Sequence, residues 1–115
     1  MIGDAKSPTL HSIVDKAEVA IDFPDKFYSG AFGRDCAFAA RADAEGFMIR
    51  LVRSGDIPRV VEMHLHHSLF ADILQELAAS LNAREPIDTL HREALLKAAQ
   101  GLANALQRGT KIAPE

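Results

Sequence analysis

Three residues able to ligate a metal recur at every second position near the middle of the chain: Glu62, His64 and His66. Apolar residues alternate with them over residues 60–66, which is the period of a β-strand with one buried face. The carboxylate and both imidazoles would therefore point to one side of the strand, and the apolar side chains to the other. Two imidazoles and one carboxylate form a ligand set that suits divalent transition metals. The spacing predicts a candidate metal site at Glu62, His64 and His66.

A second interpretation of the same strand face competes with the metal site. If Arg50 lies opposite Glu62 on a neighbouring strand, the carboxylate is engaged in a cross-strand ion pair, and the face is a solvated surface or an interface. A His-x-His pair on a strand also needs a further ligand from elsewhere, and His11 and His91 are remote in the sequence. No nucleophile motif accompanies the histidines, so we expect no catalytic residue and no cofactor. This interpretation favours a protein that is not an enzyme.

A β-hairpin is the element that would position these side chains. Residues 47–53 and 59–66 are both strand-like, and a loop with glycine and proline separates them. Placing Arg50 opposite Glu62 keeps both faces of the hairpin consistent. In that register one face is apolar throughout and consists of Phe47, Ile49, Leu51, Val61, Met63 and Leu65.

The first part of the chain carries further strand signals. Residues 16–23 alternate apolar and polar side chains and stop at a proline, which predicts a strand with one buried face. The aromatic and glycine-rich residues 27–33 fit either a short edge strand or a loop that places Phe27 and Phe32 on the core. Residues 36–41 are expected to form a hairpin with the following strand across a turn that ends in Gly46. We expect a left-handed backbone at this glycine, and a bulge there would shift the register.

Two amphipathic helices are predicted for the rest of the chain. Ser68 offers an N-cap hydroxyl for a helix that runs to Asn82. Asp88 is expected to cap a second helix from Thr89, and Gly109 fits the C′ position after its end. The apolar residues at helical spacing are Phe70, Ile73, Leu74, Leu77 and Leu81 in the first helix, and Leu95, Leu102 and Leu106 in the second. Strands first and helices last predict an α+β fold, with an antiparallel sheet of four to five strands followed by two C-terminal helices packed on one face.

Length and composition predict one domain in a reducing compartment. We expect a flexible leader over residues 1–12, a single domain over 13–109 and a tail over 110–115, since 115 residues suffice for one core. The formal charge of -3 argues against a nucleic-acid partner. A signal peptide and a membrane span are not evident, and Cys36 is the single cysteine. These features favour a cytoplasmic protein in which Cys36 is a small buried side chain rather than a reactive thiol.

Two apolar surfaces suggest self-association. The sheet face that carries the histidines also carries Met48, Val52 and Val60, which is more apolar than a solvated surface requires. The second helix has a ridge of small residues at helical spacing, formed by Ala94, Ala98, Gly101 and Ala105. A glycine inside a helix lowers stability by about 1 kcal/mol relative to alanine. We therefore infer that Gly101 serves the close approach of another backbone, in this chain or in a partner.

The sequence therefore leads to two functional hypotheses. The first is a small non-enzymatic interaction module that self-associates as a homodimer and binds a protein partner. The alternative is a small metal- or ligand-binding protein, with or without catalysis, that uses Glu62, His64 and His66.

Overall fold

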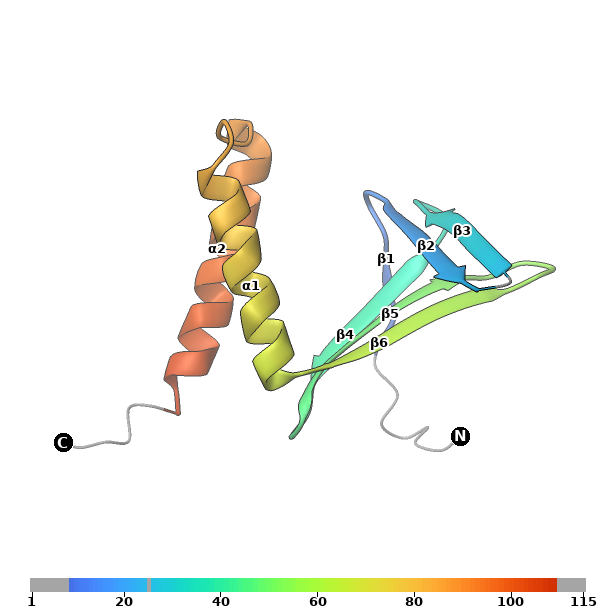
Figure 1. Ribbon diagram of the computed structural model, residues 1–115, viewed down its shortest axis with the longest axis horizontal. Helices are drawn as coiled ribbons and strands as arrows, with labels where there is room; N and C mark the ends of the chain where they lie inside the picture. The colour runs from blue at the N-terminus through green and yellow to red at the C-terminus, as the bar shows by residue number, and fades with distance from the viewer. Residues whose placement is uncertain (1–8, 25, 110–115) are drawn as a thin grey trace. The chain divides into compact units, whose positions relative to one another are not determined.

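The computed structural model describes residues 9–24 and 26–109, and within them six strands precede two helices (Figure 1). The predicted α+β class is confirmed. The chain divides into two compact units, one up to Ile73 and the other from Leu74. Packing of the helices on one face of the sheet, and the single domain over 13–109, stay predictions. The predicted tail over 110–115 and most of the predicted leader over 1–12 lie outside the described residues.

Four strands form the main antiparallel sheet, in the order β1-β4-β5-β6. They are β1 (His11–Ser12), β4 (Ala37–Ala42), β5 (Gly46–Arg53) and β6 (Arg59–His66). Strands β5 and β6 pair in the predicted register, with Arg50 opposite Glu62 and Leu51 opposite Val61. Strand β4 pairs with β5 without interruption from Ala37 to Ala42. One face of the hairpin is therefore apolar and the other carries Glu62, His64 and His66, as the alternation predicts.

A separate two-stranded sheet, made of β2 (Ala17–Phe23) and β3 (Lys26–Phe32), supplies the centre of the core. The segment 27–33, which fitted either a strand or a loop, is thus largely a strand. The ring of Phe32 is fully buried and lies in one cluster with Ile13 and Cys36, both buried. Partly buried Val19, Leu51 and Val61 pack against this cluster. The predicted burial of Cys36 is confirmed. Phe32 is buried although its segment is a strand rather than the loop that would have placed it on the core, and the side chain of Phe27 lies outside the described residues.

The turn between β4 and β5 differs from the prediction at Gly46. Among the described glycines only Gly55 has a positive φ, so the expected left-handed backbone at Gly46 is wrong. Gly46 instead pairs with His66, and a Cβ atom built on it would lie 2.7 Å from the Cα of His66. Real Cβ atoms essentially never come so close, and thus the glycine lets β5 and β6 approach one another. Because β4 and β5 pair continuously, the register shift that a bulge would cause is absent here.

The two helices are α1 (His67–Asn82) and α2 (Thr89–Gln107). Helix α1 begins directly after β6, so Ser68 lies in its first turn rather than at its N-cap. The ring of Phe70 lies 4.6 Å from that of Phe47, centroid to centroid, and covers part of the apolar sheet face. Within the described chain neither helix is both long and apolar enough to span a membrane.

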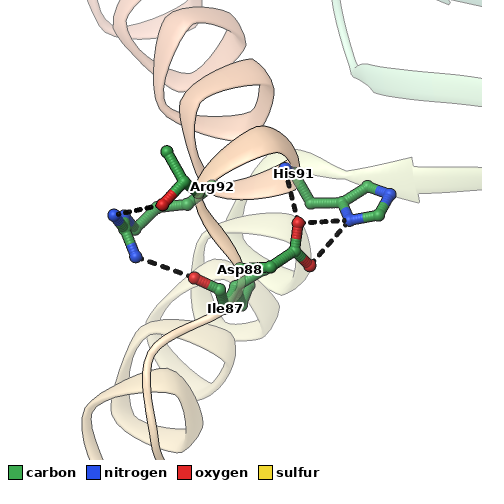
Figure 2. A network of polar contacts seen from close by, with 5 residues as sticks. Ile87, Asp88, His91 and Arg92 are labelled. Carbon is green, nitrogen blue, oxygen red and sulfur yellow. Dashed lines mark hydrogen bonds and ion pairs between the residues drawn. The ribbon is translucent and has the colours of Figure 1, made fainter.

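Helix α2 has the predicted N-cap. A carboxylate oxygen of Asp88 accepts a hydrogen bond from the backbone N–H of His91 at 3.2 Å, and the other carboxylate oxygen lies 2.8 Å from the ring Nδ1 of His91 (Figure 2). The guanidinium of Arg92 donates to the carbonyl of Ile87 at 2.8 Å. These contacts fix the first turn of α2. At its other end Arg108 is the C-cap, and Gly109 follows without a positive φ.

Candidate functional site

The two histidines of the alternating strand lie side by side at the end of β6. The rings of His64 and His66 are 5.0 Å apart between centroids and meet at 62°. Across the hairpin, Met48 lies opposite His64 and Gly46 opposite His66. Because Gly46 has no side chain, the turn that precedes β5 comes close to the histidines. The structure thus brings together two of the three residues in the predicted metal site.

The carboxylate nearest to the two imidazoles belongs to Glu45, in the turn before β5. One ligand atom each from Glu45, His64 and His66 can be chosen so that all three lie within 4.8 Å of one another. Glu62 is engaged elsewhere, since its Oε1 accepts a hydrogen bond from Nη2 of Arg50 at 3.1 Å. The cross-strand ion pair that competed with the metal site is therefore present, and the carboxylate that joins the histidines comes from a different element.

Asp43 also contacts the ring of His64. Its Oδ2 lies 3.0 Å from Nε2 of His64, and its Oδ1 accepts hydrogen bonds from the backbone N–H groups of Glu45 and Gly46, both at 2.9 Å. The backbone N–H of Glu45 contributes most to lowering the pKa of Asp43 to about 2, with further contributions from Gly46 and His64. An ionised carboxylate only accepts hydrogen bonds, so Nε2 of His64 carries the proton. In the neutral ring this leaves Nδ1 with a free lone pair.

This group of side chains lies open to solvent. Glu45, His64 and His66 are all exposed, and the side chain of His64 is 34% accessible. An open surface position can bind an ion through its side chains, but it does not exclude water from a reaction. The arrangement suits a binding site better than a catalytic one.

Glu45 lies on a different element from the histidines, so the spacing of residues along one strand does not indicate it. The register with Arg50 opposite Glu62 also places Gly46 opposite His66. The residue before Gly46 must then lie next to the histidines, since neighbouring strands are about 5 Å apart. The third ligand, Glu45, could have been predicted from the cross-strand neighbours of the histidines, but not from the i and i+2 positions alone.

The predicted interface residues on the same sheet face differ in exposure. Val52 lies opposite Val60, which is 58% exposed, whereas Met48 is only 3% exposed. Met48 is thus covered within the chain. Exposed apolar surface on this face comes mainly from Val60.

Both helices leave most of their apolar side chains exposed. No residue of α1 or α2 is buried, although both helices have apolar residues at helical spacing. Leucines exposed by 37% or more occur along both helices: Leu69, Leu74, Leu77 and Leu81 in α1, and Leu90, Leu95, Leu96 and Leu106 in α2.

An apolar groove lies where the end of α1, the connecting loop and the first half of α2 meet. Its volume is about 510 Å³, and its lining includes Leu81, Ile87, Leu95, Leu96 and Ala99. The predicted ridge of small residues, Ala94, Ala98, Gly101 and Ala105, is exposed as well. A Cβ atom at Gly101 would meet nothing within 4 Å. No described residue of this chain makes the close approach that was inferred for this glycine.

Comparison of the chain with protein-family models, with curated proteins and with solved structures found no match.

Proposed function

We propose that the protein is a non-enzymatic interaction module that self-associates as a homodimer through α1 and α2. One observation carries this proposal: two helices with regular apolar stripes contain no buried residue. Most of the stability of a helix in a protein comes from burial of its apolar face, because propensity alone is marginal at this length. The missing burial is what a second copy of the chain would supply.

Burial of leucine side chains would supply the free energy of dimer formation. Full burial of one leucine side chain contributes about 1.5–3 kcal/mol, and contiguous exposed apolar patches of several hundred Å² are uncommon on monomers. Leu77, Leu95 and Leu106 are each more than half exposed. Covering several such side chains from two chains at once offsets the cost of association.

A second copy fits this surface better than an unrelated partner. Two hairpins of amphipathic helices can combine into a four-helix bundle, and twofold symmetry is the commonest arrangement of homo-oligomers. The exposed residues of the stripes are mainly leucine and alanine, so two identical chains, each with a formal charge of -3, would meet mainly through uncharged side chains. The open space at Gly101 further allows the backbone of a second helix to come close.

We also propose a protein partner and a cytoplasmic location. The exposed Val60 on the histidine-bearing face of the sheet would remain available for that partner when the helices form the dimer. The single cysteine, buried and free, supports a reducing compartment.

Light scattering after size-exclusion chromatography of the full chain tests the dimer. We expect twice the chain mass at micromolar concentration, and half that value for Leu95→Glu, which puts a charge into the apolar groove. Gln100→Glu is the matched control, because it adds the same charge to the same helix outside the apolar stripe. A monomeric parent chain, or a Leu95→Glu variant that remains as dimeric as Gln100→Glu, would overturn the proposal.

A further inference from the structure

We infer that Glu45, His64 and His66 form a binding site for a divalent transition metal of the zinc type. The observation that carries the inference is the convergence of one carboxylate and two imidazoles, from a turn and a strand, with ligand atoms within 4.8 Å of one another. The site lies in the sheet unit and uses none of the helix residues proposed for self-association. It is therefore independent of the dimer.

The distances fit a site that needs only side-chain movement. Zinc binds nitrogen and oxygen ligands at about 2.0–2.2 Å, so ligand atoms around a tetrahedral ion are roughly 3.3 Å apart. The three side chains must therefore close by up to about 1.5 Å. All three are exposed, so changes of rotamer rather than of backbone can bring the ligand atoms together.

The tautomer of His64 supports metal binding at this position. Asp43 accepts the Nε2 proton of His64, which leaves Nδ1 with the lone pair that a metal requires. A carboxylate that orients a ligating histidine in this way is a recurrent second partner in zinc sites. Asp43 is itself fixed by the backbone N–H groups of Glu45 and Gly46, so it can hold the imidazole in place. Asp43 is thus a positioning residue rather than a ligand.

The donor set also indicates the class of metal. Calcium and magnesium prefer sites made of oxygen ligands, whereas imidazole favours zinc, nickel and copper. In addition, the guanidinium of Arg41 lies 3.7 Å from Asp43 and offsets part of the negative charge of the turn. A hard, strongly hydrated cation would gain little here.

Isothermal titration calorimetry of the untagged full chain with zinc chloride tests the inference. We expect one zinc ion per chain, and an affinity reduced at least about tenfold in both His66→Ala and Glu45→Gln, because each removes a ligand. Glu62→Gln is the matched control: it neutralises a carboxylate on the same face as His64, but one that pairs with Arg50. Its affinity for zinc should equal that of the parent chain.

Circular dichroism of each variant distinguishes the loss of a ligand from the loss of the fold. Glu45 lies in an exposed turn whose hydrogen bonds use its backbone, so Glu45→Gln should retain the parent spectrum even if His66→Ala does not. The inference is overturned if zinc does not bind, if both ligand variants bind as the parent chain does, or if Glu62→Gln weakens binding as much as Glu45→Gln. The Leu95→Glu variant should bind zinc unchanged, which separates this result from that of the dimer.

Discussion

The sheet unit and the helices of this protein differ in the burial of their apolar residues. In the sheet unit Phe32 and Ala39 are fully buried and Met48 nearly so, which gives the strands a small core of their own. Helices α1 and α2 contain no buried residue. A helix satisfies its backbone hydrogen bonds internally, so it can be formed while its side chains still lack a core. Under the proposed function, the helices are therefore the part of the chain whose stability would depend on association.

The largest expected effect is the loss of stability when a side chain of the sheet core is removed. Phe32→Ala removes a fully buried ring and should lower the free energy of unfolding by about 3–5 kcal/mol. The loss should be the same at every protein concentration, because Phe32 packs against residues of its own chain. Urea unfolding of the parent and the variant at two concentrations measures it.

Leu106→Ala is the matched variant in the helices, where the leucine is 60% exposed. It should change the stability of the monomer little, and lower stability only at concentrations at which the dimer forms. If Leu106→Ala lowers the free energy of unfolding as much as Phe32→Ala does in dilute protein, the sheet and the helices do not differ in the way described.

The sequence was a good guide to the hairpin of β5 and β6 and to both helices. Alternation over residues 60–66 and the pairing of Arg50 with Glu62 follow from local patterns that a half-buried strand imposes. The N-cap at Asp88 is equally local, since it depends on one side chain and the first turn of α2. Such features need no knowledge of distant parts of the chain.

Features that depend on spatial neighbours were harder to predict. The two residues of β1 carry no strand period and pair with Phe38 and Ala37 of β4. Gly46 was expected to serve a turn, but it serves the approach of β6. Glu45 joins the histidines only because of that approach. Helical periodicity likewise indicates which side chains of α1 and α2 are apolar, but not which molecule covers them.

A second, smaller effect tests the close approach at Gly46. The added methyl group of Gly46→Ala would collide with the backbone of Leu65 and His66, so the ends of β5 and β6 must separate. Overpacking of this kind costs about 1–3 kcal/mol. Thermal unfolding followed by circular dichroism should show the loss in dilute protein, as expected for a contact within the sheet unit.

Gly33→Ala is the control for this substitution. A Cβ atom at Gly33 would meet nothing within 4 Å, and the residue has no positive φ. Its stability should match that of the parent chain. Equal stability of the Gly46→Ala variant would mean that β5 and β6 are farther apart than the structure places them.

The smallest expected effect concerns the part of helix stability that needs no second copy. The pKa of Asp88 lies below its ordinary value of 3.8, mainly because its carboxylate accepts a hydrogen bond from the ring of His91, and also one from the backbone N–H of His91 (Figure 2). A pKa lowered by folding means that Asp88 stabilises α2 fully above pH 3.8, and that this contribution is lost as the pH falls through the lowered pKa. Asparagine caps a helix about as well as aspartate but does not titrate. We therefore compare the monomeric Leu95→Glu variant with the same variant that also carries Asp88→Asn. Circular dichroism should show that the variant with Asp88→Asn loses less helix as the pH falls. Identical acid profiles would mean that the start of α2 does not depend on the charge of Asp88.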